Sequence, residues 1–280
     1  MNHPIAMIPY ANMAPYEALG PPEGCYFVHC APRNSIEALK TGAVWAAAVP
    51  VGGLAALEGV VEPVGVFGIA AYREVMSVLF FSDRPFDQFK APQSVRLTGE
   101  SASSVRLLYL LLGYQNGFEM IPPLAGAGTQ ANGELLIGDA ALKWLHLWEA
   151  KGEVKGFAHV TDMAAEWERW HHLPFVFARW VVRVDAPAQV RLNLEHWLAR
   201  FEEQESALIS LSAPKVAQRL DLPHDYVTRY LKVIRRCLTK EDQAGQEKFL
   251  AEWRRHGSSR AEVWFASEAY TSMTRTHSHE

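Results

Sequence analysis

The sequence predicts an α/β protein built from two lobes, and three features of its patterning indicate this. Strand-like and helix-like segments alternate from the N-terminus to about Ala71. A second alternating unit follows, and the chain then returns along a long apolar strand and finishes in helices. Such alternation favours parallel strands with helical crossovers. We therefore expect a first lobe from residues 1–85 and 176–280, an inserted lobe from residues 86–175, and a ligand cleft between them.

Length and composition exclude several classes of protein. The chain has 280 residues and a formal net charge of −4, so it can bury a sizeable core and has no basic field for nucleic acid. No apolar run suits a membrane span, and the N-terminal segment lacks the basic and apolar regions of a signal peptide. The 3 cysteines follow no metal-binding or disulfide spacing. We expect a cytoplasmic protein without a metal site, and the sequence does not indicate its oligomeric state.

The first lobe is expected to begin with short apolar strands, over residues 5–8, 26–30 and 44–49. Asn34 or Ser35 starts the helix between the last two, and Gly42 closes it, since glycine tolerates the left-handed conformation at a helix end. Residues 50–53 open another helix, and residues 60–71 are expected to form two short strands. The glycines of this region match no nucleotide-binding fingerprint.

Asn12 and Ser77 are polar residues at strand–loop junctions of this lobe. Asn12 lies between Pro9 and Pro15, which fix the backbone of the loop after the first strand. Its side chain either bonds its own backbone, as in many turns, or faces a ligand from the end of the strand. Ser77 begins the apolar strand over residues 76–81. It either bonds a neighbouring backbone group or belongs to the same site.

The stretch over residues 95–112 is predicted to be a strand, a tight turn at Gly99 and a helix with a broad apolar face. Ser101, Ser103 and Ser104 stand at the start of this helix. The first backbone N–H groups there have no partner within the helix, and the helix dipole is positive. A single serine is an ordinary N-cap, whereas three hydroxyls together also suit a bound carboxylate or phosphate.

A second strand–turn–helix junction follows at residues 135–141. Gly138 permits the turn, and Asp139 is expected to cap the helix that follows, because its carboxylate would repel an anion. Asp162 is expected to cap the next helix. The adjacent His171 and His172 are interpreted as loop or packing residues, since neighbouring histidines do not both face one metal ion easily.

The remainder of the chain is predicted to be one long strand followed by helices. The strand covers residues 175–184, and the helices cover residues 187–209, 213–220, 223–237 and 239–256. Thr239 and Asp242 resemble a capping box. One face of the third helix is basic and is interpreted as a solvated surface; it carries Arg229, Lys232, Arg235 and Arg236. The chain beyond Tyr270 is expected to be disordered.

Four stretches carry a resemblance to a known family. They are residues 8–12 (IPYAN), 76–82 (MSVLFFS), 136–142 (LIGDAAL), and Glu166-Trp167 through residues 173–178 (LPFVFA). In this order and spacing they resemble the chorismate dehydratases of the futalosine route to menaquinone. The resemblance extends to about Arg255 and implies a two-lobed fold like that of periplasmic binding proteins of the second type.

The resemblance also implies an activity: a hydro-lyase that removes water from chorismate to give 3-[(1-carboxyvinyl)oxy]benzoate without a cofactor. Asn12 and Ser77 fall on positions important to the family's site and are the candidate catalytic residues. The base suggested for the family is the substrate's own enolpyruvyl carboxylate. The candidate substrate-binding residues are Ser101, Ser103, Ser104, Gly138 and Asp139.

Three positions depart from the family pattern. Trp45 stands where the family often has aspartate, Ser103 where it usually has threonine, and Arg179 where it tends to have a small apolar residue. The alternative interpretation is a cytoplasmic protein that binds or senses a small carboxylate without catalysis. Fold does not separate the two, because function depends on the site; incubation with chorismate does.

Overall fold

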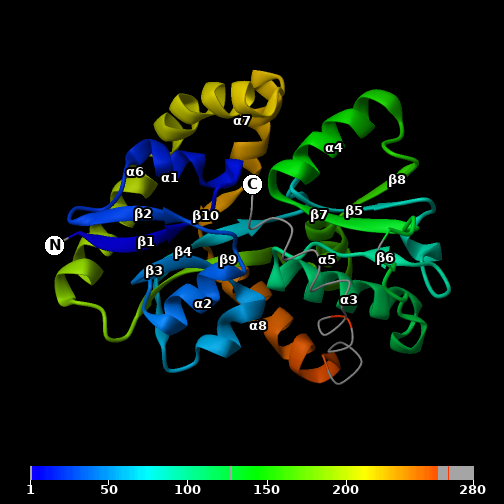
Figure 1. The fold of residues 1–280 in the computed structure, drawn as a ribbon, viewed down its shortest axis with the longest axis horizontal. Coiled ribbons are helices and arrows are strands. Elements are labelled where there is room, and N and C mark those ends of the chain that lie inside the picture. The colour runs from blue at the N-terminus through cyan, green and yellow to red at the C-terminus, as the bar shows by residue number, and fades with distance from the viewer. Residues whose placement is uncertain (1, 127, 258–263, 265–280) are drawn as a thin grey trace. The chain divides into compact units, whose positions relative to one another are not determined.

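The computed structural model describes residues 2–126, 128–257 and 264. The chain forms two compact units, and each contains its own β-sheet and helices (Figure 1). The first unit comprises the chain up to Ala71 and Val176–Gln243, and the second comprises Tyr72–Phe175 and the described residues from Ala244 onward. The sequence predicts residues 72–85 and the last helix in the first lobe, whereas residues 72–85 and most of that helix lie in the second unit.

The sheet of the first unit has six strands in the order β10-β4-β9-β3-β1-β2. Their bounds are β1 His3–Met7, β2 Cys25–His29, β3 Ala46–Pro50, β4 Val61–Ala71, β9 Phe175–Arg183 and β10 Arg235–Cys237. Strand β1 pairs in parallel with β2 and β3, as the alternating pattern predicted, whereas β9 is antiparallel to β3. The three parallel strands therefore end at one edge of the sheet, and β9 begins there.

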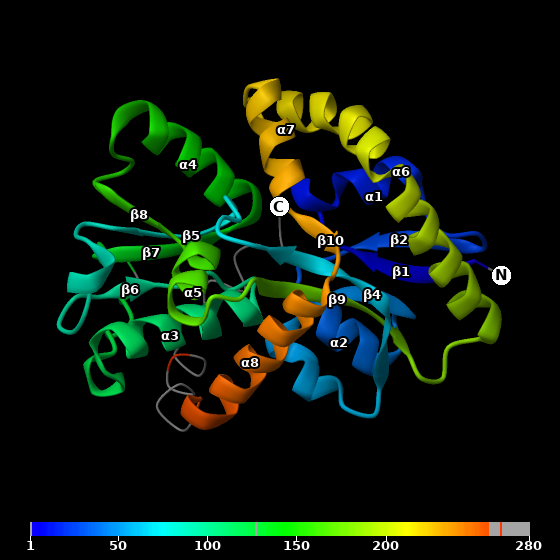
Figure 2. The same ribbon diagram turned by 180° about the vertical axis from the view of Figure 1, so that it is seen from behind.

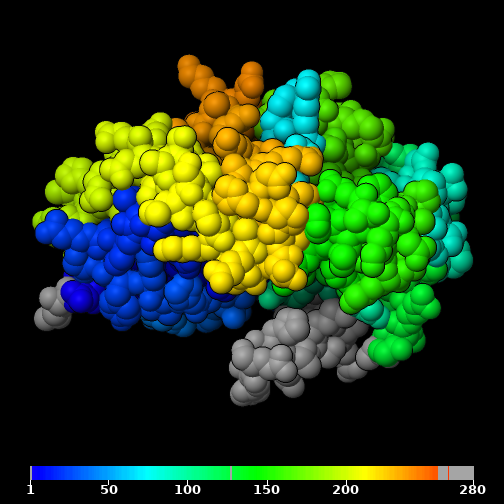
Figure 3. All heavy atoms as spheres, turned by 90° about the horizontal axis from the view of Figure 1, so that it is seen from above, coloured from blue at the N-terminus to red at the C-terminus, as the bar shows by residue number. Residues whose placement is uncertain are grey.

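Helices cover both faces of this sheet. They are η1 Ala11–Met13, α1 Ala14–Leu19, α2 Asn34–Thr41, η2 Val51–Leu57, α6 Ala188–Leu220 and α7 His224–Val233. On one face, Tyr16 of α1 stacks on Phe201 of α6 at 3.8 Å between ring centroids and also contacts Trp180 and Trp197. Figure 3 shows α6 and α7 in yellow and orange over the blue N-terminal segment. Leu39 and Leu57 pack with Val49 and Val181 in an apolar cluster built around α2 and η2.

The sheet of the second unit has four strands in the order β6-β7-β5-β8. Their bounds are β5 Val78–Ser82, β6 Val95–Arg96, β7 Gly133–Ile137 and β8 His159–Asp162. Strand β5 is antiparallel to β7 and β8, whereas β6 and β7 are parallel. The start of β5 therefore lies at the same edge as the ends of its neighbours β7 and β8.

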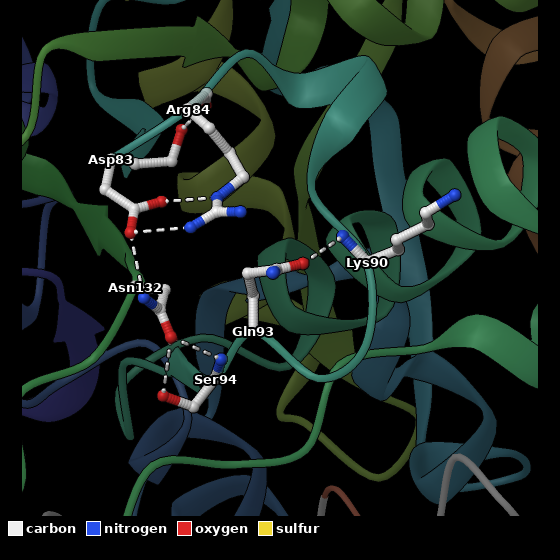
Figure 4. Close-up of polar contacts among 7 residues, drawn as sticks. Asp83, Arg84, Lys90, Gln93, Ser94 and Asn132 are labelled. Atoms are coloured by element: carbon white, nitrogen blue, oxygen red, sulfur yellow. Dashed lines mark hydrogen bonds and ion pairs between the residues drawn. The ribbon is translucent and has the colours of Figure 1, made fainter.

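A polar network fixes the opposite edge of this sheet (Figure 4). The Asn132 amide donates to Asp83 Oδ2 at 2.8 Å, and its oxygen accepts from the backbone N–H of Ser94 at 3.0 Å. Arg84 donates to Asp83 and, with Asn132, holds the pKa of that carboxyl below its usual range. The network ties the loop after β5 to the segment before β7 and lies far along β5 from Ser77.

The helices of the second unit include one contributed by the C-terminal part of the chain. They are η3 Phe86–Gln88, α3 Ala102–Asn116, η4 Phe118–Met120, α4 Gly138–Lys151, α5 Met163–His171 and α8 Lys240–His256. Phe249 of α8 is fully buried against Phe175 and Trp167. The hydroxyl of Tyr114 in α3 donates to Glu252 of α8 at 2.8 Å. These contacts attach α8, orange in Figure 2, to the second unit.

Three predicted elements differ from the structure. Residues 61–71 form one strand rather than two: Gly65 adopts a φ of +51°, and Gly68 lets the backbone of β9 approach closely. Helix α6 continues through Pro214, because buried residues before and after the proline keep packing against the unit although one helical hydrogen bond is lost. The helix predicted to reach residue 237 ends at Val233, and β10 follows. The disorder predicted beyond Tyr270 concerns residues outside those described.

Candidate functional site

The candidate residues of the second unit are brought to one edge of its sheet by strand register. Ser77 directly precedes β5, and Val78 lies opposite Ile137 of β7. Gly138 follows Ile137, and its backbone N–H donates to the carbonyl of Ser77 at 2.8 Å. Since β6 is parallel to β7, the chain also leaves β6 toward this edge and then enters α3. Ser77 and Gly138 therefore contact each other, and the segment after β6 that carries the serines at the start of α3 leaves the sheet at the same edge.

Ser77 occupies a constrained turn. The preceding residue, Met76, has a φ of +59°, a conformation that costs energy for a side chain larger than glycine. Ser77 is buried, and its hydroxyl donates to the Val75 carbonyl at 3.3 Å. The predicted hydrogen bond from Ser77 to a neighbouring backbone group is thus present. This long hydrogen bond is compatible with a second partner, because a hydroxyl also accepts.

Asp162 holds this turn in place. Its Oδ2 accepts from the backbone N–H groups of Val75 and Met76, both at 2.9 Å, and its Oδ1 accepts from Ala164 at 2.9 Å and more weakly from Ala165. The predicted N-cap of α5 is confirmed, and the contact with the Ser77 turn is additional. Burial raises the pKa of Asp162 to about 6, although the four backbone N–H groups favour the charged form.

The start of α3 is a buried cluster of hydroxyl groups. Ser101 is the N-cap, with its Oγ accepting from the backbone N–H of Ser104 at 3.1 Å and donating to the Ser104 hydroxyl at 2.9 Å. Ser101, Ser103 and Ser104 are at most 6% exposed. The capping interpretation is confirmed for Ser101. The anion-binding interpretation of the cluster stays a prediction.

Gly138 and Asp139 form the start of α4. Gly138 adopts a φ of +60°, which explains why glycine stands at this turn. The prediction that Asp139 caps the helix is wrong: the N-cap is Ile137, which makes no side-chain capping bond, and Asp139 lies inside the first turn. Helix α4 begins at Gly138, before Asp139 rather than after it. A carboxylate in the first turn still interacts favourably with the helix dipole.

Asn12 lies in the first unit, in the turn η1 between β1 and α1. Its backbone carbonyl accepts from Arg236, from Nε at 3.3 Å and from Nη2 at 3.1 Å. Its side-chain oxygen is buried and, among the described residues, has no hydrogen-bond partner. A buried acceptor without a partner costs about 1–3 kcal/mol, so this amide is the unsatisfied group that a bound donor would complete.

The structure also places the residues that depart from the family pattern. Trp45 contacts the guanidinium of Arg183 and the ring of His3, both within the first unit. Arg179 is buried in β9, where its Nη2 donates to the Gly65 carbonyl at 2.8 Å, and burial lowers its pKa. Both side chains thus make contacts inside their own unit.

Two residues near the candidate site were not assigned to it from the sequence. Asp162 was predicted as a helix cap but not as the residue that holds the turn before Ser77. Arg236 was placed on a solvated helix face; this is wrong, because its side chain is fully buried and it lies in β10 rather than in a helix. Its partners Asn12 and Glu205 are distant in the sequence, so no local pattern indicates its burial.

The described residues include neither a metal-binding cluster nor a membrane-spanning helix. Within them, no cluster of three or more His, Cys, Asp or Glu side chains is arranged to hold a metal ion. None of the described helices combines the length and apolar character needed to cross a membrane. Cys25, Cys30 and Cys237 are free thiols.

Comparison with known proteins identifies the family. A family model described as menaquinone biosynthesis matches residues 4–255, which is most of the chain. The chain belongs to this menaquinone-biosynthesis family. A curated relative, the chorismate dehydratase of Thermus thermophilus, is 28% identical over 258 residues, covering 86% of this chain and 91% of the relative. The resemblance seen in the four sequence stretches is thereby confirmed at the level of the family.

Solved structures support the fold class. Protein AF1704 from Archaeoglobus fulgidus matches with a TM-score of 0.65 and 12% identity, covering 91% of this chain and 98% of that one. The alkanesulfonate-binding protein SsuA from Xanthomonas axonopodis pv. citri, bound to MOPS, matches with a TM-score of 0.63 and 13% identity over 91% and 93%. The periplasmic aliphatic sulphonate binding protein SsuA from Escherichia coli matches with a TM-score of 0.62 and 15% identity, covering 91% of this chain and 92% of that one. At these identities the likeness shows the fold, which is periplasmic-binding-protein-like, as predicted.

Proposed function

We propose that this member of the menaquinone-biosynthesis family is a chorismate dehydratase, a carbon–oxygen lyase that converts chorismate to 3-[(1-carboxyvinyl)oxy]benzoate and water. The observation that carries the proposal is the family match over residues 4–255, together with a chorismate dehydratase relative that covers 86% of the chain. A cytoplasmic location is part of the proposal, and three free thiols suit a reducing compartment.

The proposed site uses neutral polar groups. Chorismate carries two carboxylates, and the buried hydroxyls at the start of α3, with Gly138 and Asp139 at the start of α4, are the proposed binding positions of the second unit. Helix starts favour negative charge and offer backbone N–H donors. Asp139 adds negative charge at this place, so its contribution is to orient the helix start rather than to contact a carboxylate.

Asn12 and Ser77 are proposed to act on the reacting ring of the same bound chorismate. The Asn12 amide, whose oxygen is buried without a partner among the described residues, orients the substrate or the departing hydroxyl. The Ser77 hydroxyl hydrogen-bonds the leaving oxygen or the charge that develops as the ring proton leaves. Each of these residues lies at the edge of its sheet where a strand meets a loop, which is where open α/β folds place their sites.

The proton acceptor in this proposal is the enolpyruvyl carboxylate of chorismate itself. The ring loses one proton and the neighbouring hydroxyl, and these leave as water while the ring becomes aromatic. An intramolecular base needs no protein group with a shifted pKa, and it needs accurate orientation instead. Good orientation supplies up to about 7–11 kcal/mol of a reaction barrier.

The test is incubation of the purified protein with chorismate, followed by chromatography and ultraviolet detection of the aromatic product. Ser77→Ala and Asn12→Ala are expected to lower turnover by about 10²–10³-fold, the usual loss for one transition-state donor. Ser82→Ala is the matched control. Ser82 is the last residue of β5, at the opposite edge of the sheet; like Ser77 it is buried and donates to a backbone carbonyl two residues away, that of Arg84. It is expected to retain turnover.

Two outcomes contradict the proposal in different ways. If Ser77→Ala and Asn12→Ala, shown to be folded, convert chorismate at the parent rate, the assignment of these two residues is wrong. If the parent binds chorismate and returns it unchanged, the enzyme assignment fails and a carboxylate sensor takes its place.

A further inference from the structure

Arg236 is a fully buried guanidinium that no catalytic step proposed above uses. Its position is set by β10, where it lies between Arg235 and Cys237 just after α7. A buried arginine is costly unless its charge is paired and its N–H groups are hydrogen-bonded. The partners that satisfy Arg236 therefore indicate what the side chain does.

Those partners lie in three segments of the first unit: the Asn12 turn, α6 and the end of α7. Nη1 forms an ion pair with Glu205 of α6 at 2.8 Å and donates to the carbonyls of Leu231 at 3.0 Å and Ile234 at 3.2 Å. Nε and Nη2 both point to the carbonyl of Asn12, at 3.3 and 3.1 Å. One side of the guanidinium is thus anchored to α6 and to the end of α7, and the other side holds the Asn12 peptide.

The contact with Asn12 restrains the backbone of this residue. Two N–H groups of a planar fork meet its carbonyl oxygen. A carbonyl accepts hydrogen bonds best near the plane of its lone pairs, so displacing or turning the peptide weakens both bonds. The same residue carries the buried side-chain oxygen that has no partner among the described residues. A small rotation of the Asn12 backbone would move that amide away from its direction.

We propose that Arg236 is the positioning residue for Asn12: its guanidinium, oriented by Glu205, holds the Asn12 carbonyl so that the Asn12 amide points toward the substrate. This inference rests on the proposed function for the chemistry, but the contact itself is independent of it. Arg236 acts through Asn12 and does not touch the substrate.

The first test is steady-state kinetics with chorismate for Arg236→Lys. Lysine keeps the charge and can still pair with Glu205, but its single ammonium does not reproduce the fork on the Asn12 carbonyl. We expect kcat to fall about 10²-fold, the usual effect of a misplacement of about 1 Å, while KM changes little. The matched control is Arg183→Lys. Arg183 lies in the same unit and also combines a carboxylate partner, Asp185, with a backbone carbonyl, that of Leu39; its kcat should stay at the parent value.

A double-mutant cycle separates positioning from general stability. In an Asn12→Ala background the amide is absent, so Arg236→Lys should produce no further loss of kcat. An equal loss in both backgrounds, or an unchanged kcat in Arg236→Lys alone, overturns the proposal. If Arg236→Lys does not fold, Glu205→Gln replaces it in the same cycle, because it removes the carboxylate that orients the guanidinium. The same two results overturn the proposal.

A spectroscopic readout keeps this inference distinct from the proposed function. In protein labelled with ¹⁵N at asparagine, the side-chain amide signals of Asn12 are identified by their loss in Asn12→Ala. They should shift in Arg236→Lys, or in Glu205→Gln, and stay in place in Arg183→Lys. If the parent converts no chorismate, the proposed function fails while these signals still decide on Arg236. Unmoved Asn12 signals refute the positioning role whatever the activity.

Discussion

Replacing Asp162 with asparagine tests how the turn before Ser77 is held. The Asp162 carboxylate uses one oxygen for the N–H groups of Val75 and Met76 and the other for the start of α5. An asparagine has only one side-chain oxygen. Its NH₂ group, itself a donor, must therefore face one of the two pairs of backbone N–H groups and leave that pair without an acceptor. Losing hydrogen bonds to a carboxylate and leaving donors unpaired costs about 1–3 kcal/mol each. We expect Asp162→Asn to lower the free energy of unfolding by roughly 2–4 kcal/mol.

The pH dependence of this loss follows from the pKa of Asp162. Burial raises that pKa from 3.8 to about 6, so the folded state holds the proton more tightly than the unfolded state. The resulting stability is fully present below about pH 3.8 and is lost as the pH rises through 6. The full shift corresponds to about 3 kcal/mol. Between about pH 4.5 and 7.5 the stability advantage of the parent over Asp162→Asn should shrink by about 2 kcal/mol.

The assay is urea unfolding of both proteins at several pH values, followed by circular dichroism, with chorismate turnover measured alongside. Turnover of Asp162→Asn should fall by more than the decrease in the fraction of folded protein. The reason is that Met76 has a strained φ, which relaxes when its N–H loses the carboxylate. A stability advantage that stays constant with pH, or grows as pH rises, would refute the raised pKa. Parent-like turnover in folded Asp162→Asn would show that Ser77 does not depend on this contact.

Three further predictions concern single residues of the second unit. Gly138→Ala should lose about 1–2 kcal/mol of stability, because its φ of +60° disfavours a Cβ, and it should lower turnover by disturbing the N–H that bonds Ser77; thermal unfolding and kinetics check both. Gly245→Ala should lose several kcal/mol of stability or fail to fold, since a Cβ there would clash with the Pro174 carbonyl oxygen; the yield of folded protein and urea unfolding check this. Burial, helped by the nearby charges of Lys248 and His172 and opposed by that of Glu252, lowers the pKa of His171 to about 4. His171 therefore contributes stability above about pH 6.5 that is lost as pH falls toward 4. In that window the free energy of unfolding of His171→Phe should depend less on pH than that of the parent.

Local patterns in the sequence predicted much of the fold because the relevant contacts span few residues. The capping box at Thr239 and Asp242 is observed, with Asp242 accepting from the Thr239 N–H at 2.8 Å and Thr239 accepting from the Asp242 N–H at 3.2 Å. Asp162 caps α5 and Ser101 caps α3, both within three residues of their partners. Alternating apolar segments likewise located most strands. In these cases the side chain and its backbone partner are close enough for spacing to determine the contact.

The contacts that shape the candidate site span long distances in sequence, so no local pattern indicates them. Asn12 and Arg236 are 224 residues apart, and Asp162 lies 87 residues from Val75. Local rules also misjudged Arg236, because basic residues at helical spacing usually mark a solvated face. The chain over residues 187–220 was likewise predicted to be two helices, whereas α6 continues from Ala188 to Leu220. In both cases tertiary packing outweighed the local preference.

The charged groups near the two candidate catalytic residues fit a reaction that needs accurate placement more than acid–base power. Asn12 and Ser77 are neutral, and a neutral donor stabilises developing charge only if it already points in the right direction. Each is adjacent to a backbone group held by a charged side chain: the carbonyl of Asn12 by Arg236, and the N–H groups of Val75 and Met76 by Asp162. A charged group forms stronger hydrogen bonds than a neutral one, so it restrains the backbone more firmly. If this division of roles is correct, substitutions at Arg236 and Asp162 affect turnover only while Asn12 and Ser77, respectively, are present.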